Sequence, residues 1–361
     1  MINICISLFF CVTSRILYKK MLTHKKFFFL IISILIISSI FISKNITKTI
    51  SPSKDLVTFI SFGDNPHVPE IEVENNLKML INSINDHNPS LVIHVGDTLG
   101  GREPCTDSMI DLQRKMINRL NAPVLYTPGD NEWRDCYQDK KGLTFDNQER
   151  LAYLRKTYFS NNKSLGKNSI NVSNYREEGY PENARVVIDN VAFITAHLVG
   201  SNNNYDPKSE RNTREYLARD MANIKWINDS FSKYREVSAF VVAIHADMYT
   251  EEFLLSTEYK KFGMNLYEIS NKYKKPVLIL FGDSHKFRDF QPMPKDYPYI
   301  YAIENYGNPD LKALMIQVDI SKNKPFIIIK VIKGESAITW FIRNSKRVFN
   351  YLRRNLNSIF E

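Results

Sequence analysis

The chain has 361 residues, 43% of them hydrophobic and 12% aromatic, which is enough for one large folded domain or two ordinary ones. This composition excludes a disordered, repetitive or collagen-like protein. The net charge of +9 lies at the two ends, because residues 1–50 and 321–361 each carry +7 and residues 51–320 carry −5. Basic ends on an acidic body favour a membrane surface over a nucleic-acid groove, so no nucleic-acid partner is expected.

The N-terminal part has the pattern of a targeting segment. Residues 27–43 form an apolar run without charge, Pro or Gly, and the preceding leader 1–26 is basic. This pattern predicts a signal peptide or a transmembrane anchor, followed by a linker over 44–54. The positive-inside rule then predicts export to the periplasmic or extracellular face, with the protein membrane-anchored or secreted. The alternative, a buried core helix, is disfavoured because no polar face interrupts the run.

Short apolar runs rich in Val, Ile, Leu and Phe recur after this segment, and each ends in a loop of polar residues. Such runs predict buried strands. They cover 56–62, 91–95, 124–126, 239–244 and 277–281. Helical patterns lie between them, over 70–87, 107–120, 146–158, 210–233 and 251–274. Strands alternating with helices predict an α/β fold with largely buried strands.

Later apolar runs predict further strands, which we expect to form a second sheet. They cover 184–195, 299–303, 312–319 and 325–333. The stretches 160–183 and 200–213 are polar and are expected to be loops. The predicted folded domain therefore covers 55–335, and a basic amphipathic segment follows over 336–361.

Acids, amides and imidazoles gather at the predicted strand ends, where ligands bind in α/β folds. These residues are Asp64, Asp97, Asn131, His245, Asp283 and His285. Oxygen and imidazole donors suit divalent ions such as Mn, Fe, Zn or Mg. Six donors are too many for one tetrahedral ion, but they suit two ions that share a bridging carboxylate. No Ser-His-Asp arrangement and no phosphate-binding glycine loop stands out in the sequence.

The order of these motifs resembles the calcineurin-like metallophosphoesterase family, whose motifs are D-x-H, GD-x-x-D, GN-H-[DE], a lone His and GH-x-H. The resemblance spans residues 64–285. It implies a two-sheet sandwich flanked by helices, and a dinuclear metal centre whose activated water hydrolyses a phosphate mono- or diester. Asp97 would bridge both ions, Asp64 and His285 would hold one, and Asn131, His245 and Asp283 would hold the other. The GDNEW and GDSH motifs resemble a divergent branch found in secreted bacterial proteins.

The motifs depart from the family pattern at several positions. His67 comes one residue late in the first motif and is a candidate ligand, and the second motif has Gly100 where the family has its second Asp. Glu132 stands where this reading places the catalytic His, and it could serve as an acid if burial raises its pKa. Asp283 replaces a His but keeps an oxygen donor.

Each of the other residues near the motifs has two possible interpretations. His197 ends an apolar run and could supply the missing imidazole, or it could be a structural histidine. Arg134 could bind a phosphate oxygen or form a surface ion pair. Asn203 could bind a polar substrate, although turn formation is the better interpretation of the Asn-rich loop. The catalytic candidates are therefore Asn131, Glu132 and His197.

Cysteine usage agrees with export. Cys105 and Cys136 are the only cysteines in the predicted domain, and an even pair in an oxidising compartment predicts a disulfide. The alternative is two unpaired buried thiols. A disulfide would tie the loop after Asp97 to the loop after Asn131.

These observations predict an exported metallophosphoesterase with a phosphorylated substrate and two divalent metal ions. The alternative is a non-catalytic metal- or phosphate-binding module anchored at the membrane, which the altered second, third and fifth motifs motivate.

Overall fold

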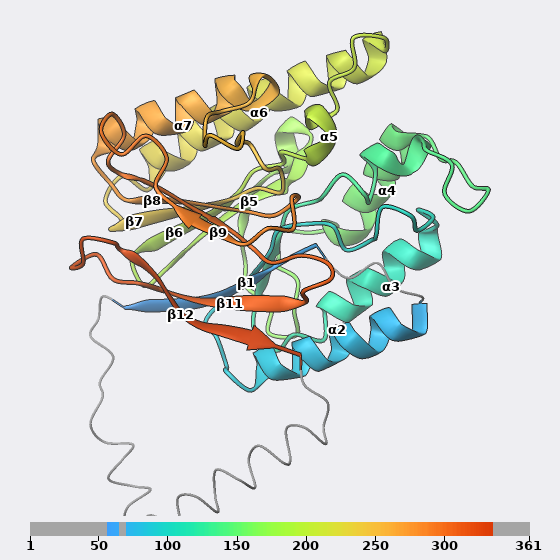
Figure 1. Cartoon of the computed structure of the whole chain (residues 1–361), viewed down its shortest axis with the longest axis horizontal. Coiled ribbons are helices and arrows are strands. Elements are labelled where there is room, and N and C mark those ends of the chain that lie inside the picture. The colour runs from blue at the N-terminus through green and yellow to red at the C-terminus, as the bar shows by residue number, and fades with distance from the viewer. Residues whose placement is uncertain (1–55, 65–69, 335–361) are drawn as a thin grey trace, which may run out of the picture. The chain divides into compact units, whose positions relative to one another are not determined.

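Two mixed β-sheets face each other, and helices cover the outer face of each (Figure 1). The computed structural model describes residues 56–64 and 70–334. The predicted leader, apolar segment 27–43, linker, candidate ligand His67 and C-terminal segment 336–361 lie outside these residues. Within the described ranges, no helix is both long and apolar enough to span a membrane. The predicted α/β fold with two sheets and flanking helices is confirmed.

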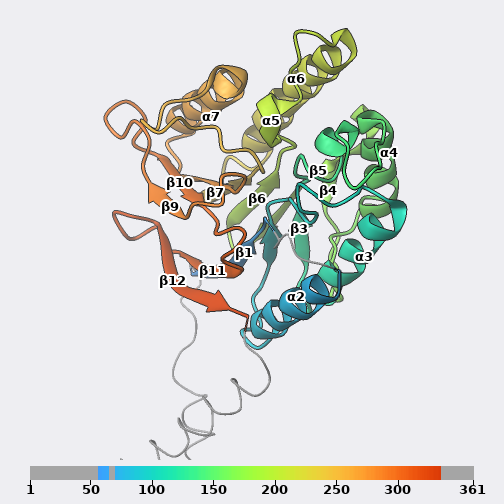
Figure 2. The same ribbon diagram turned by 45° about the vertical axis from the view of Figure 1, so that its right-hand side comes forward.

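The first sheet has parallel strands on one side and antiparallel strands on the other. Its order is β12 (Phe326–Lys333), β11 (Lys312–Val318), β1 (Val57–Phe62), β2 (Val92–His94), β3 (Val124–Tyr126). Strands β1, β2 and β3 are parallel, whereas β11 runs antiparallel to both of its neighbours. The helices of this side are α2 (Glu70–Asn85), α3 (Asp107–Ile117) and α4 (Asn147–Tyr158). Figure 2 shows α3 and α4 beside β3.

The second sheet contains seven of the described strands. Its order is β4 (Ser173–Tyr175), β5 (Tyr180–Ile188), β6 (Val191–Thr195), β7 (Ala239–Ala243), β8 (Val277–Phe281), β10 (Ile300–Glu304), β9 (Arg288–Phe290). Strands β6, β7, β8 and β10 are parallel. Helices α6 (Glu210–Lys233) and α7 (Lys260–Tyr273) lie over the outer face (Figure 1). Short turns connect these elements: η1 (Arg134–Tyr137), η2 (Arg176–Glu178), α5 (Gly200–Asn203) and η3 (Thr257–Tyr259).

Strands at the middle of both sheets are apolar on both faces because they contribute to two cores. In β7, Val241 faces the core between the sheets, while Phe240 and Val242 pack against the helices of the second sheet. Phe59 of β1 meets Phe193 of β6 edge-on across the inner core, with ring centroids 5.2 Å apart. Burial on two faces explains why these strands read as continuous apolar runs instead of alternating ones.

The structure corrects several of the predicted elements. The run 184–195 is a hairpin of β5 and β6, because Asp189 and Asn190 adopt positive φ values of 43° and 67° at a two-residue turn. Strands β11 and β12 belong to the first sheet, not the second. The last predicted helix begins only at Lys260, since residues before it form a loop and η3. The polar stretch 160–183 contains β4 and the start of β5.

The Phe59–Phe193 contact yields a stability prediction. Replacing Phe193 by Ala should lower the free energy of unfolding by about 3–5 kcal/mol, because the change leaves a cavity between the two sheets. Chemical denaturation measures this loss. Val187→Ala is the control, since that side chain is 39% exposed on the neighbouring strand and should change stability by less than about 1 kcal/mol. Equal effects of the two changes would contradict this account of the inner core.

Candidate metal centre

Five strand ends from both sheets deliver the polar residues of the candidate site. Asp64 follows β1, Asp97 follows β2 and Asp130 follows β3 in the first sheet, while His245 follows β7 and Asp283 follows β8 in the second. Carboxyl ends of parallel strands lie at one edge of a sheet, and the two sheets bring these edges together. The side chains therefore form one cluster despite wide spacing in the sequence.

His245 occupies the centre of this cluster and is fully buried. Its Nδ1–H donates to the carbonyl oxygen of Val95 at 2.7 Å, which leaves Nε2 facing the acids. The distances from Nε2 to Oδ1 are 3.4 Å for Asp97, 3.2 Å for Asp130 and 3.8 Å for Asp283. An imidazole held at one nitrogen by a carbonyl and surrounded by carboxylates at the other is typical of a metal ligand.

Burial makes this concentration of acids unfavourable for the protein alone. It raises the pKa of Asp64 to about 8, that of Asp283 to about 7 and that of Asp97 well above its usual range. Burial also works to raise the pKa of Asp130, but hydrogen bonds from His245 and Ser201 and the attraction of His245 lower it. Burial opposes protonation of His245, yet the surrounding carboxylates raise its pKa well above the ordinary value.

The donor set fits divalent cations. Two groups bring their ligand atoms within 4.8 Å of one another: Asp64 with Asp97 and His245, and Asp130 with His245 and Asp283. The Oδ2 atom of Asp64 is buried and has no hydrogen-bond partner among the described residues. A cation would supply the missing partner of this oxygen and would offset the repulsion between the acids.

His285 extends the cluster on the side of Asp64. Its Nδ1–H donates to the carbonyl oxygen of Asn308 at 2.9 Å, and its Nε2 lies 3.8 Å from Oδ1 of Asp64. The side chain of His285 is 26% exposed, so this side of the cluster is open to solvent. Both histidines thus present Nε2 to the acids and anchor Nδ1 on a backbone carbonyl.

The backbone at the cluster is strained. Asp64, Asp97, Asp283 and His285 have φ values of 49°, 53°, 77° and 63°. This left-handed region costs a non-glycine residue about 1–2 kcal/mol and is typical of functional sites. Close packing also explains the glycines of the motifs: a Cβ on Gly282 would lie 2.1 Å from Oδ2 of Asp64.

The third motif places its residues one position away from the sequence interpretation. Asp130 lies against His245, while the Asn131 side-chain amide donates to Oδ2 of Asp97 at 2.5 Å. Counted from Gly129, Asp130 stands at the Asn of the motif G-N-H-[DE], Asn131 at the His and Glu132 at the acid. The sequence interpretation matched Asn131 to the Asn of the motif because the residue types agree, and it therefore missed Asp130. Counting from the glycine would have found it.

Glu132, a catalytic candidate from the sequence, is fully buried. Its carboxylate accepts hydrogen bonds from the backbone N–H of Gly129 at 3.1 Å, the hydroxyl of Thr98 at 2.7 Å and the hydroxyl of Tyr126 at 3.1 Å. These bonds tie the loop after β2 to the loop after β3. In the structure, Glu132 supports the two ligand-bearing loops.

The side chains of the remaining candidates bond to residues other than the cluster acids. His197 is buried, its Nδ1 lies 2.8 Å from Glu182, and burial lowers its pKa to about 4. Asn203 is also buried, and its side-chain oxygen accepts a hydrogen bond from Arg219 at 2.7 Å. Arg134 forms an ion pair with its chain neighbour Asp135 at 2.8 Å. The Arg134 side chain is only 13% exposed, so this ion pair does not lie at the surface as the alternative interpretation had it.

Cys105 and Cys136 lie beside the third motif at disulfide geometry, with Cα atoms 5.7 Å apart. Their sulfurs lie 3.3 Å and 3.5 Å from the carbonyl oxygen of Asn131. The pair joins the loop after Asp97 to η1, so a bond here restrains the backbone whose side chain holds Asp97.

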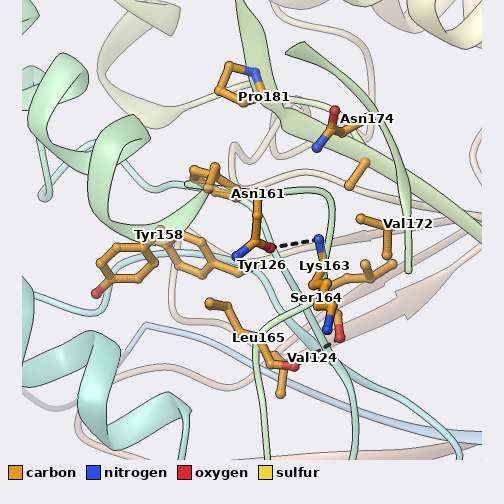
Figure 3. A pocket seen from close by; sticks show the side chains of 13 residues that line it. Val124, Tyr126, Tyr158, Asn161, Lys163, Ser164, Leu165, Val172, Asn174 and Pro181 are labelled. Atoms are coloured by element: carbon orange, nitrogen blue, oxygen red, sulfur yellow. Dashed lines mark hydrogen bonds between the residues drawn. The ribbon is translucent and has the colours of Figure 1, made fainter. Parts of the chain in front are cut away.

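A small cavity opens elsewhere, between β3, the end of α4 and strands β4 and β5 (Figure 3). Its volume is about 20 Å³, room for little more than one water molecule. Tyr126, Tyr158 and Leu165 are among its mostly apolar lining residues, and none of the cluster acids lines it. This cavity is therefore separate from the candidate metal centre.

A comparison with models of protein families identifies one family. The family model described as calcineurin-like phosphoesterase matches residues 66–287. No curated protein matches the chain.

Several solved structures are similar to the chain at low sequence identity. GAP50, the anchor in the inner membrane complex of Plasmodium, is 9% identical, with 78% of this chain and 90% of that chain covered and a TM-score of 0.43. A dimetal phosphatase from Danio rerio is 10% identical, with 77% and 99% covered and a TM-score of 0.49. The purple acid phosphatase PPD1 of yellow lupin is 13% identical, with 73% and 49% covered and a TM-score of 0.44.

The cysteine pair yields a prediction that peptide mapping can test. Alkylation in denaturant without reductant should leave Cys105 and Cys136 unmodified, and a linked peptide should be found. Reduction should lower the free energy of unfolding by about 4 kcal/mol, because the bond closes a loop between residues 31 positions apart. Alkylation of either cysteine before reduction would contradict the disulfide.

Proposed function

Because the chain belongs to the calcineurin-like phosphoesterase family, we propose that it is a metal-dependent hydrolase of phosphate esters. The observation that carries this proposal is the arrangement of His245, whose Nε2 faces three carboxylates at the shared edge of the strands. The alternative of a non-catalytic binding module is not favoured, because the family model that matches most of the chain is that of phosphoesterases.

In this proposal, Asp97 would serve as a ligand to both of two divalent ions. Asp64 and His285 would complete the site of the first, and Asp130, His245 and Asp283 that of the second. Two such ions would supply a water of lowered pKa as the nucleophile and would neutralise the charge of a phosphoryl group. Asn131 acts on the bridging ligand, since its backbone N–H and its side-chain amide donate to the two oxygens of Asp97.

The donor set favours hard cations. At two positions where the family motifs have neutral Asn and His, this chain has Asp130 and Asp283. These substitutions add two negative charges and replace an imidazole by an oxygen donor. Carboxylate-rich sites suit Mn²⁺ and Mg²⁺ better than softer ions, so Mn²⁺ is the ion of choice for loading among Mn, Fe, Zn and Mg.

The leaving group receives little help from the described residues. Asn131 stands where the motif has its histidine, and an amide cannot act as a general acid. In the described ranges, the only imidazoles at the cluster are the proposed ligands His245 and His285. We infer that the substrate is a phosphate ester with a good leaving group.

The protein is proposed to act outside the cytoplasm. Support comes from the sequence pattern of the basic leader and the apolar segment 27–43, and from a cysteine pair at disulfide geometry. The proposal covers both a membrane-anchored and a secreted protein.

Metal analysis tests the function first. The full chain, purified without chelator and loaded with Mn²⁺, should hold two ions, and Asp97→Asn should lose at least one. The same change should reduce phosphatase or phosphodiesterase activity at least about 100-fold, because loss even of an outer-shell partner can cost that much. Asp86→Asn is the control, since that carboxylate is exposed after α2. A metal-replete protein inactive on both ester classes would contradict the proposal.

The position of Asn131 yields a second prediction, on leaving groups. The wild-type kcat/KM should fall steeply from aryl to alkyl phosphate esters, because the described residues at the cluster place no general acid at the departing oxygen. Asn131→His should raise the alkyl rate at least about tenfold relative to the aryl rate, since general acids contribute about 100-fold or more. Metal content, measured in parallel, controls for damage at Asp97. Similar wild-type rates on both ester series would overturn this inference.

A further inference from the structure

The loop between β6 and α6 contains an unusual backbone turn. Residues Ser201, Asn202, Asn203 and Asn204 have φ values of 52°, 57°, 53° and 66°, and none of them is glycine. L-amino acids visit the left-handed region as single residues and not as runs. Such strain persists only where the surrounding structure imposes it, and it is typical of ligand sites.

A buried arginine imposes this conformation. Arg219 of α6 is fully buried and donates to Oδ1 of Asn203 at 2.7 Å and to the Asn203 carbonyl at 2.9 Å. It also donates to the carbonyl oxygen of His197 at 2.7 Å and to Glu215 at 2.7 Å. The guanidinium therefore ties the turn both to β6 and to α6.

A tyrosine fixes the turn from the other side. The hydroxyl of Tyr259 donates to the carbonyl oxygen of Val199 at 2.9 Å and accepts from the N–H of Asn203 at 3.2 Å. The side-chain amide of Asn204 donates to Glu215 at 2.8 Å. These contacts from α6 and η3 hold the backbone of the turn in place.

The turn packs against two of the proposed metal ligands, Asp283 and Asp130. Gly200 lies so close that a Cβ there would be 2.5 Å from Oδ1 of Asp283 and 2.8 Å from Oδ2 of Asp130. The hydroxyl of Ser201 donates to Oδ2 of Asp130 at 2.7 Å, the shorter of its two carboxylate contacts, since Oδ2 of Asp135 lies 3.2 Å from the same hydroxyl oxygen. The other oxygen of Asp130, Oδ1, faces Nε2 of His245 at 3.2 Å. The serine thus holds the carboxylate with Oδ1 directed at the centre of the cluster.

We propose that Ser201 is a positioning residue of this site, whose hydroxyl orients Asp130 for binding a divalent cation beside His245 and Asp283. The proposal rests on the proposed function only in requiring that the cluster binds such a cation. Hydrogen-bond partners of ligating carboxylates set metal affinity in this way. The strain points in the same direction: glycine would adopt φ 52° without cost, so the hydroxyl is what a serine contributes there.

The chain offers a matched pair of variants. Ser201→Gly removes the hydroxyl and relieves the strain at one position. Asn202→Gly relieves the same strain at the next position but keeps the hydroxyl. The side chain of Asn202 is exposed and makes no hydrogen bond or ion pair with any residue of the described ranges. Glycine relieves strain, while loss of the Ser201 hydroxyl removes a hydrogen bond to the buried Asp130, so both variants are expected to fold with melting temperatures within a few degrees of wild type.

Calorimetric titration of the metal-stripped full-length protein with Mn²⁺ alone tests the proposal. Ser201→Gly should weaken one of the two binding steps by about 10–100-fold. Asn202→Gly should bind like wild type. Thermal melting of each metal-free variant, monitored by circular dichroism, distinguishes a loss of Mn²⁺ affinity from a loss of folding.

Each contrary result has a distinct meaning. Wild-type affinity in Ser201→Gly would overturn the role of Ser201 and leave the proposed function intact. An equal loss in both glycine variants would also overturn it, because backbone strain and not the hydroxyl would then control the site. A wild-type protein that binds no Mn²⁺ would overturn the proposed function itself, and with it the present inference.

Discussion

The structure depends on one constraint, the burial of four carboxylates around a single imidazole. Asp64, Asp97, Asp130 and Asp283 surround His245 at the meeting edge of two sheets. Burial raises the pKa of three of these acids, so the protein alone does not favour their ionised forms. A fold that gathers such groups must hold each one rigidly, because any relaxation would separate like charges and expose them to water.

The surroundings of the cluster supply that rigidity through hydrogen bonds from outside. Carbonyl oxygens hold both histidines at Nδ1, and Asn131 holds both oxygens of Asp97. Glu132 ties the loops that carry Asp97 and Asp130, and the proposed role of Ser201 extends the same principle to Asp130 itself. Directional bonds to the backbone restrict each ligand to one orientation at low cost in side-chain entropy.

Local sequence patterns predicted the strands and most of the helices, because apolar runs that end in Gly-Asp read directly as buried strands. Strand partners were harder to predict. Strand β11 pairs with β1, and nothing in an apolar run specifies a partner so far away in the chain. The hairpin inside 184–195 was missed although Asp189-Asn190 is a turn signal. At the site, five strand-end residues were found from their order, whereas Asp130 was missed because two neighbouring polar residues competed for one motif position.

The backbone conformation at Ser201–Asn204 could not be predicted from local sequence patterns. Propensity assigns Ser201–Asn204 to an ordinary turn, yet the conformation is set by Arg219, which lies on the next helix and is invisible to local sequence. His197 illustrates the converse, since its place at a strand end suggested chemistry while its Nδ1 is paired with Glu182 of the neighbouring strand. Long-range hydrogen bonds decide in both cases. Function at this site is therefore encoded as much in the buried partners of the ligands as in the ligands themselves.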